Sequence, residues 1–344
     1  MYKITNSNMI KSDSIRGVIT ILFIVMMSAL LYALDAYILP LNIWIFLIWC
    51  AVLISGNALI IEIYNKSLFR ENKKSHIPTT NEIKKIQSIV AESEKEYIKI
   101  HAIPVSTCQS PMKSKFGGLP YLKNLNDIPI DKNGKRMCFL AQINFEESPQ
   151  LPHYPDKGIL QFFVSEDNYG ADYEFDMLAK NQNIKVIYIE NPEIMNSNST
   201  TQEIPQLHEV YFAKEFKLEF EKSKEGITFS DYRLPKIITK ELGEYADETF
   251  LYDEHNEYIK FNSGEEHKIG GYLFCAQLDP RVNSGNDTEN EEYEVLLQIV
   301  SQYNEISKKY EIIWGDSGVG HFFIKPSDLQ KKDFSKVKFS WDCF

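Results

Sequence analysis

The stretch MCFLAQINFEESPQLPHYPDKGILQFFV, residues 137–164, contains two short apolar runs separated by a segment with prolines and a glycine. Both runs, residues 137–143 and 158–164, are rich in aromatic and aliphatic side chains and are bounded by turn-forming residues, which is typical of strands. The pattern recurs toward the end of the chain and predicts further strands at residues 185–190, 208–220, 272–277, 294–301, 311–314 and 321–325. Helices are expected at 236–248 and after Pro326. The body is therefore predicted to be mainly β.

A helix is also predicted upstream of these strands. Thr79 is followed three residues later by Glu82, which is a capping-box pattern, and apolar residues then recur at near-helical spacing from Ile83 to Tyr97. These features predict an amphipathic helix over about 80–99, packed on the body behind it.

Composition excludes several classes of protein. The 344 residues are 44% hydrophobic and 25% charged, which is ordinary for a folded chain. Residues 75–344 contain 30 Lys and Arg against 44 Asp and Glu, so a nucleic-acid partner is not expected. None of the 5 Cys and 7 His forms a close metal-binding pair, and we expect no metal site and no cofactor.

Two long uncharged runs near the N-terminus predict a membrane anchor. Residues 17–34 and 36–61 lack charged side chains, and each is long enough for a helix that crosses a bilayer. Lys and Arg flank the pair on both sides and are absent between the runs, which predicts that both termini and the body are cytoplasmic. A cleaved signal peptide would account for only one of the two runs. The predicted organisation is an N-terminal segment at 1–15, a transmembrane hairpin at 16–63, a linker at 64–79 and a body at 80–344.

The body contains a weak internal repeat. The pairs Gly-Gly, Ala-Gln and Leu-Gln occur in the same order twice, at residues 117–118, 141–142 and 160–161 and again at 270–271, 276–277 and 297–298. Three matches in order predict a duplicated half-domain.

Several motifs together resemble a known family. They are Lys115-Phe-Gly-Gly-Leu-Pro120, Phe139-Leu-Ala-Gln-Ile-Asn-Phe145, Gly158-Ile-Leu-Gln-Phe-Phe163, Gly270-Gly-Tyr-Leu-Phe-Cys-Ala-Gln-Leu-Asp-Pro-Arg281 and Trp314-Gly-Asp-Ser-Gly318. In this order they resemble the YwqG-like proteins, a bacterial domain of unknown function, from about residue 80 to the last residue. The resemblance implies an α+β fold, largely sheet, with duplicated halves. It implies no known reaction, cofactor or catalytic residue.

Motifs that suggest catalysis are better explained as structure. Gly315-Asp-Ser-Gly318 is similar to the nucleophile segment of chymotrypsin-like proteases, but the surrounding triad context is missing, and we interpret it as a turn. The two Gly-Gly pairs are interpreted as turns or close backbone approaches, because Pro120 removes an amide that a phosphate loop would use and Gly270-Gly271 leads into a strand rather than a helix. Cys-His catalysis, for which His101 and Cys108 lie in one stretch, is a weak interpretation because the sequence identifies no partner that orients a histidine. A metal site in the acidic stretch 167–176 is a weaker interpretation than a solvated acidic loop.

The best candidate binding site combines residues from both repeats. Gln142 with Asn144, and Gln277 with Asp279, occupy positions i and i+2, which lie on one face of a strand. Arg281 follows the second pair. If the halves are related by pseudosymmetry, these five side chains converge on one cleft. The alternative is that the amides satisfy neighbouring backbone groups.

The sequence favours a non-enzymatic function. We expect a membrane-anchored cytoplasmic protein-interaction module, with the lipid bilayer as one partner through its two helices and a basic protein as the other, because the body is acidic. The alternative is a small-molecule-binding protein or hydrolase that uses the polar cleft. Five side chains gathered in one cleft would favour this alternative, and dispersed ones would oppose it.

Overall fold

The computed structural model describes residues 79–106, 110–124, 127–165, 183–193, 212, 214–242, 262–283 and 292–344. The chain divides between residues 75 and 76, and all the described residues belong to the second unit.

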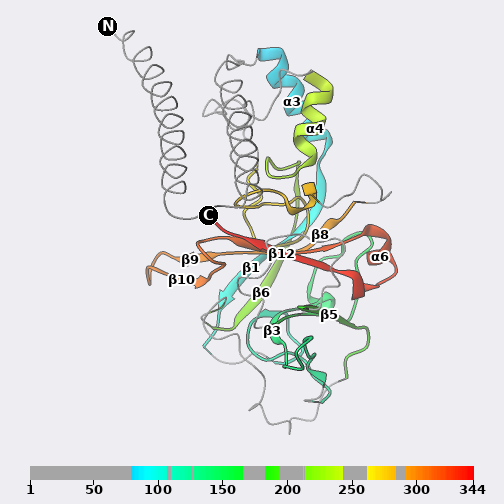
Figure 1. Cartoon of the computed structure of the whole chain (residues 1–344), viewed down its shortest axis with the longest axis vertical. Helices are drawn as coiled ribbons and strands as arrows, with labels where there is room; N and C mark the ends of the chain where they lie inside the picture. The colour runs from blue at the N-terminus through cyan, green and yellow to red at the C-terminus, as the bar shows by residue number, and fades with distance from the viewer. Residues whose placement is uncertain are drawn as a thin grey trace, which may run out of the picture. The chain divides into compact units, whose positions relative to one another are not determined.

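A ten-stranded antiparallel sheet dominates this unit (Figure 1). Its strand order is β12-β11-β8-β7-β1-β6-β2-β3-β4-β5. The strands are β1 (Lys95–Pro104), β2 (Lys115–Phe116), β3 (Cys138–Asn144), β4 (Ile159–Val164), β5 (Ile184–Ile189), β6 (Phe216–Glu225), β7 (Lys268–Gly270), β8 (Glu294–Val300), β11 (Val319–Ile324) and β12 (Lys338–Asp342). Two further strands, β9 (Gln302–Asn304) and β10 (Lys309–Ile312), form a separate hairpin.

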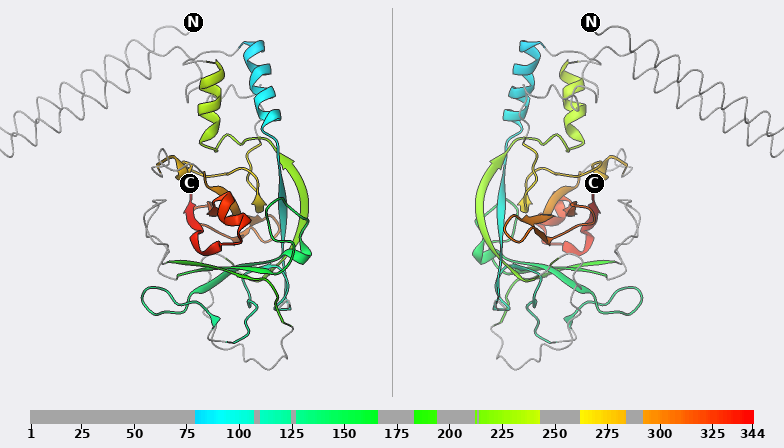
Figure 2. Two further views of the ribbon diagram at one scale, coloured as in Figure 1. Left: turned by 90° about the vertical axis from the view of Figure 1, so that its right-hand side faces the viewer. Right: turned by 90° about the vertical axis from the view of Figure 1, so that its left-hand side faces the viewer.

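The order of the strands is symmetric about the central pair, β1 and β6. Strands β1 and β6 pair along their whole length, from Lys95 opposite Glu225 to Pro104 opposite Phe216. Four strands continue from each of them, so that β7, β8, β11 and β12 correspond in order to β2, β3, β4 and β5. Figure 2 shows the long central pair along one side, with the two half-sheets extending from it.

The two half-sheets enclose one core. The rings of Phe162 on β4 and Phe322 on β11 have centroids 4.7 Å apart, and Tyr188 on β5 contacts Phe334 with a centroid distance of 5.5 Å. Every residue of β3, β4 and β11 is buried, which explains why their sequences are continuous apolar runs rather than alternating ones.

Few helices accompany the sheet in the described part of the chain. The α-helices are α3 (Thr80–Glu92), α4 (Arg233–Leu242) and α6 (Pro326–Gln330), and the short 3₁₀ turns are η2 (Phe145–Glu147), η5 (Pro280–Asn283) and η7 (Phe334–Lys336). The capping box of Thr79 and Glu82 begins α3 as predicted. Figure 2 shows α3 and α4 side by side, and Ile86 of the first shares a buried apolar cluster with Leu234 and Ile238 of the second.

The prediction of an α+β fold is wrong, because the described residues are mostly β with few helices. The helix predicted over 80–99 ends at Glu92, and the chain from Lys95 becomes the central strand β1. Tyr97 was assigned to the helix by its spacing from Val90. Tyr97 is instead buried as a residue of strand β1, in which Ile98, Ile100 and Ala102 are also buried.

The N-terminal hairpin predicted over 16–63 receives no support. Its residues lie outside the described ones. None of the helices that the structure describes combines the length and apolar composition that crossing a bilayer requires.

Two predicted strands are misplaced. Residues 272–277 form a loop that follows the short strand β7, and the strand predicted over 208–220 is displaced to Phe216–Glu225. Strands β2, β9 and β12 were not predicted, since none of them has a long apolar run. The other predicted strands agree with the structure to within about two residues at each end, which is the usual uncertainty of boundaries.

Candidate functional site

Each half of the sheet contains the sequence Lys-x-Gly-Gly at a corresponding position. The first copy is Lys115–Gly118, at β2, and the second is Lys268–Gly271, at β7. All four glycines have positive φ, between 63° and 77°. A Cβ atom at Gly118 would overlap the carboxylate of Glu215, and one at Gly271 would overlap that of Glu225. Glycine is therefore required for both the backbone conformation and the close approach of a carboxylate.

In each copy, the buried lysine pairs with the same carboxylate that the second glycine approaches. Lys268 Nζ lies 2.8 and 2.9 Å from the two carboxylate oxygens of Glu225, and Lys115 Nζ lies 3.3 Å from Glu215 Oε1. Both lysine side chains are 0% exposed. Burial lowers the pKa of Lys268, although Glu225 opposes the shift. These pairs lie inside the fold and present no charge to solvent.

A buried glutamine fastens the loops around the first copy. Gln142 Nε2 donates to the carbonyls of Pro111 and Lys113, at 2.7 and 2.9 Å, and its Oε1 accepts from the backbone N–H of Tyr121 at 2.8 Å. These partners lie four and two residues before Lys115 and six residues after it.

Gln298 makes the same three contacts around the second copy. Its Nε2 donates to the carbonyls of Gly264 and Glu266, at 2.8 and 2.9 Å, and its Oε1 accepts from the N–H of Phe274 at 2.9 Å. The partners again lie four and two residues before the lysine, Lys268, and six residues after it. Gln142 and Gln298 are therefore counterparts.

The neighbouring strands add a second pair of counterparts. Gln161 lies opposite Gln142 in the sheet and donates from Nε2 to the carbonyl of Tyr121 at 2.7 Å. His321 lies opposite Gln298, and its Nε2 is 2.6 Å from the carbonyl of Phe274. A histidine thus occupies, in the second half, the place that a glutamine occupies in the first.

This correspondence corrects the predicted alignment of the repeat. Gln277 was paired with Gln142, but it lies in the exposed loop before η5 and belongs to no strand. The residue that makes the same contacts as Gln142 is Gln298, which the predicted alignment pairs with Gln161. The Ala-Gln dipeptide at 276–277 is a chance match, and the pattern that identifies the halves is Lys-x-Gly-Gly followed by a buried glutamine.

Replacing Gln298 with alanine is expected to lower the free energy of unfolding by about 3 kcal/mol, because three buried backbone groups lose their partner. Urea unfolding measures the change. Gln277→Ala is the matched control, since Gln277 is exposed, and we expect a loss below about 1 kcal/mol. Equal losses in the two variants would show that Gln298 does not have the fastening role assigned to it.

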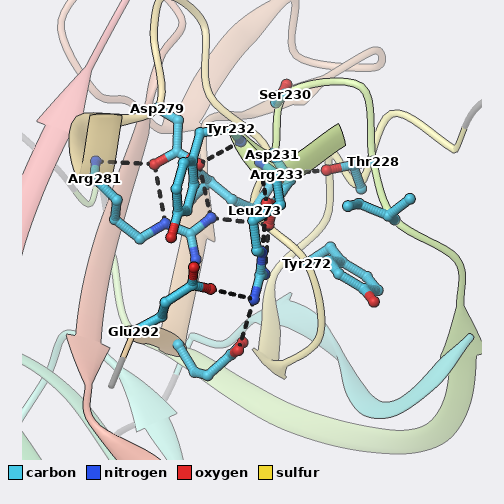
Figure 3. Close-up of polar contacts among 12 residues, drawn as sticks. Thr228, Ser230, Asp231, Tyr232, Arg233, Tyr272, Leu273, Asp279, Arg281 and Glu292 are labelled. Carbon is cyan, nitrogen blue, oxygen red and sulfur yellow. Dashed lines mark hydrogen bonds and ion pairs between the residues drawn. The ribbon is translucent and has the colours of Figure 1, made fainter. Parts of the chain in front are cut away.

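Asp279 and Arg281 belong to a buried ionic network (Figure 3). Asp279 Oδ1 accepts from the backbone N–H and from Nε of Arg281, at 3.0 and 2.9 Å, and Oδ2 accepts from Nη2 at 2.7 Å. Arg281 Nη1 donates to the carbonyl of Tyr293 at 2.9 Å. The guanidinium is thereby committed to the fold, with a side chain that is 0% exposed.

A second Asp-x-Arg sequence makes the same pair on the facing segment. Asp231 Oδ1 accepts from the N–H and Nε of Arg233, at 3.1 and 2.8 Å, and Oδ2 accepts from Nη2 at 2.7 Å. The two pairs are joined twice, because Arg281 Nη2 donates to Asp231 at 2.9 Å and the N–H of Tyr232 donates to Asp279 at 3.0 Å (Figure 3).

The network extends outward to solvent through Glu294. Arg233 Nη1 lies 2.9 Å from Glu294 Oε1, and Lys95 Nζ lies 2.7 Å from the other oxygen of that carboxylate. Burial opposes ionisation of Asp231, but the hydrogen bonds from Arg233 and the charge of Arg281 outweigh it and hold the pKa of that carboxyl well below its usual range. Asp231 therefore stays ionised, and the network holds the loop with η5 against the start of α4.

The five residues of the predicted site fall into different settings. Asn144 donates to the carbonyl of Met112 at 3.1 Å and accepts from the N–H of Glu146, so with Gln142 it holds the loop around residues 111–114. Asp279 and Arg281 hold residues 231–233. Gln277 is exposed and donates to the carbonyl of Cys343 at 2.7 Å. The observed contacts of these side chains are those of a folded scaffold.

Sequence reasoning missed several polar residues of these networks. Lys268, Gln298, Asp231 and Arg233 are as important to them as the predicted residues. Two signals were available in the sequence, the repeated Lys-x-Gly-Gly and the repeated Asp-x-Arg at 231–233 and 279–281.

The other motifs have structural roles where the structure describes them. Ser317 has a φ of 64° in the turn between β10 and β11, and its Oγ accepts from the hydroxyl of Tyr310 at 2.8 Å. Burial raises the pKa of the Cys275 thiol, which opposes a role as a nucleophile. Cys108 and the acidic stretch 167–176 lie outside the described residues. Within the described ranges, no three His, Cys, Asp or Glu side chains are grouped as a metal site requires.

Comparison with known proteins supplies the family. No curated protein matches the chain. A family described as a domain of unknown function, DUF1963, matches residues 114–343, which is about two thirds of the chain and includes both Lys-x-Gly-Gly copies and the Asp279–Arg281 pair. The chain therefore belongs to the DUF1963 family.

Proposed function

We propose that this protein is a non-enzymatic protein-interaction module whose partner is a basic protein. The observation that carries the proposal is the excess of acidic residues over residues 75–344, where 44 Asp and Glu accompany 30 Lys and Arg. A field of this sign accelerates encounter with a cationic partner and disfavours an anionic one.

Local pairing of the lysines supports this proposal. On the central strands, Lys222 Nζ lies 3.0 Å from Glu96, Lys217 Nζ lies 2.8 Å from Glu219 and Lys224 Nζ lies 3.5 Å from Glu94. Exposed pairs of this kind contribute little to stability. Each nevertheless neutralises its lysine locally, so the excess carboxylates determine the sign of the surface.

The alternative, a polar cleft for a small molecule, has less support. Such a cleft needs polar side chains that are free to meet a ligand, whereas Gln142, Asn144 and Arg281 bond to backbone or carboxylate groups inside the fold. Cytoplasmic placement of the body is part of the proposal, and the free thiols of Cys275 and Cys343 are compatible with a reducing compartment. The finer assignment to the YwqG-like proteins is also part of the proposal, and it rests on the order of the motifs.

The proposal predicts a salt-dependent complex. The 344-residue chain, used as bait in an extract of the cells that produce it, is expected to retain a basic protein in stoichiometric amount. The purified pair should then lose about tenfold in affinity between 50 and 300 mM salt, because screening removes the long-range attraction. Isothermal titration at a series of salt concentrations measures the change.

Charge variants of the central strands serve as matched tests. Glu219→Gln with Glu221→Gln should slow association about twofold to threefold, and Lys217→Gln with Lys222→Gln should accelerate it by a similar factor. An acidic or neutral partner, or an affinity that does not change with salt, would contradict the proposal.

A further inference from the structure

The two outer strands of the sheet, β5 and β12, differ in polarity at corresponding positions. On β12, Ser340 lies opposite His321, and Asp342 follows two residues further along the strand. The register places Ile187 and Ile189 at the corresponding positions of β5. The shared fold therefore accepts apolar residues at both positions, and the serine and the aspartate are particular to the second half.

The polar side chains of the second half lie on one face of the sheet. Residues opposite each other on antiparallel strands share a face, and so do residues two apart on one strand. His321 and Asp342 are thus diagonal neighbours, about 7 Å apart in the backbone. The loop before η5 covers this face, because His321 Nε2 lies 2.6 Å from the carbonyl of Phe274 and the N–H of Gln277 donates to Asp342 Oδ2 at 2.8 Å.

Two buried acceptor atoms on this face have no donor. Nε2 of His321 carries the ring proton because its partner is a carbonyl, so Nδ1 is left with a lone pair. Burial lowers the pKa of His321 to about 4, so the lone pair is available at neutral pH. Among the described residues, neither His321 Nδ1 nor Asp342 Oδ1 has a hydrogen-bond partner, and both atoms are buried. Buried acceptors are normally paired, so these two indicate a bound donor.

The carboxylate of Asp342 also lacks a cation. The nearest cationic side chains that act on His321 are Arg281 and Lys268, and both are paired elsewhere. Arg281 Nη2 lies 2.7 Å from Asp279 Oδ2. Lys268 Nζ lies 2.8 Å from Glu225 Oε1. In the part of the chain that the structure describes, no lysine or arginine forms an ion pair with Asp342, which favours a donor of positive charge.

We infer that His321 Nδ1 and Asp342 Oδ1 form a binding site for a primary ammonium group. An ammonium has three N–H donors and one positive charge, so it can meet both acceptors and balance the carboxylate. The Ser340 hydroxyl, on the same face, can accept the third N–H. A metal ion fits less well, because no third His, Cys, Asp or Glu of the described ranges joins the two residues. The inference is independent of the proposed function.

Thermal unfolding of the 344-residue chain tests the site with two probes of equal charge. Methylammonium chloride presents N–H donors, whereas tetramethylammonium chloride has none. At about 100 mM and pH 7.5, methylammonium should raise the unfolding temperature by about 3 °C relative to tetramethylammonium, because it binds only the folded chain. Heteronuclear NMR of the imidazole nitrogens should show a change at His321 Nδ1 with methylammonium and none with tetramethylammonium.

Three variants locate the effect. Asp342→Asn removes the charge, and His321→Gln keeps a donor for the Phe274 carbonyl but lacks the second acceptor, so each should reduce the difference between the probes to below about 1 °C. Asp316→Asn is the matched control. It removes the same charge from an exposed position whose carbonyl accepts from the N–H of Phe344, and the full difference should remain.

The spectra of the wild type decide the question even where a variant does not fold. An equal response to the two probes, a difference that survives in Asp342→Asn, or an imidazole spectrum that methylammonium leaves unchanged would overturn the inference. The last result would show that water or another part of the chain satisfies the two acceptors.

Discussion

Replacing Arg281 with leucine is expected to lower the free energy of unfolding by about 3–5 kcal/mol, a large part of the total stability of a typical domain. The guanidinium is the shared partner of Asp231 and Asp279, whose side chains are 0% and 1% exposed. Leucine fills much of the space but leaves the buried carboxylate of Asp279 without this cation, beside that of Asp231, which keeps its pair with Arg233. The penalty comes mainly from the uncompensated charge of Asp279 rather than from a lost contact. Chemical denaturation at pH 7.5 measures it.

The control uses the second Asp-x-Arg pair. Arg233 is 20% exposed, so water can replace part of its interactions, and Arg233→Leu should cost about 1–2 kcal/mol. Adding Asp231→Asn and Asp279→Asn to Arg281→Leu should recover part of the lost stability, because the buried negative charges are then absent. If the triple variant is no more stable than Arg281→Leu alone, uncompensated charge is not the cause of the loss.

Acidification from pH 7.5 to 5 is expected to lower the free energy of unfolding by about 4 kcal/mol through His267 and His321 alone. Burial lowers the pKa of each imidazole from its usual 6.5 to about 4. Above pH 6.5 both residues are neutral in the folded and unfolded states and have no effect. Below 6.5 the unfolded chain binds protons that the folded chain excludes, so stability falls as the pH falls, by about 2 kcal/mol for each histidine at pH 5.

Geometry supports the neutral form of His267. Its Nδ1 accepts from the backbone N–H of Val300 at 3.1 Å, and its Nε2 lies 3.1 Å from Gln302 Oε1. A proton on Nδ1 would replace an acceptor with a second donor and break the bond to β8. Urea unfolding at both pH values measures the combined effect.

The first half of the sheet supplies the control for His321. Gln161 makes the corresponding hydrogen bond to the carbonyl of Tyr121, so His321→Gln should keep the bond to Phe274 and reduce the loss on acidification from about 4 to about 2 kcal/mol. The reverse variant, Gln161→His, should increase the loss. An unchanged pH dependence in both variants would contradict the assignment.

The sequence predicts local elements well where a single physical rule governs them. The capping box at Thr79 locates the start of α3, and continuous apolar runs locate β3, β4 and β8 because both faces of these strands are buried. The end of α3 was misjudged because the spacing from Val90 to Tyr97 suits a helix, whereas tertiary pairing with β6 and β7 determines the conformation from Lys95 onward.

The candidate site was only partly predictable for a similar reason. Alternation correctly places Gln142 and Asn144 on one strand, but it does not show whether their amides face a ligand or the backbone of a neighbouring loop. The partners of Gln298 are 24 to 34 residues away in sequence, so only the folded chain shows that it is the counterpart of Gln142. Repeated dipeptides locate a duplication less reliably than repeated contacts do.

The position of β1 has a practical consequence for anyone who isolates the family domain. The family match begins at residue 114, whereas Lys95–Pro104 lies between β7 and β6 in the sheet. A fragment trimmed to the match would lack its middle strand, and the facing edges of two half-sheets would be left with unpaired backbone amides and carbonyls. Expression boundaries for this protein should therefore begin at or before Thr79, so that the seam between the halves can close.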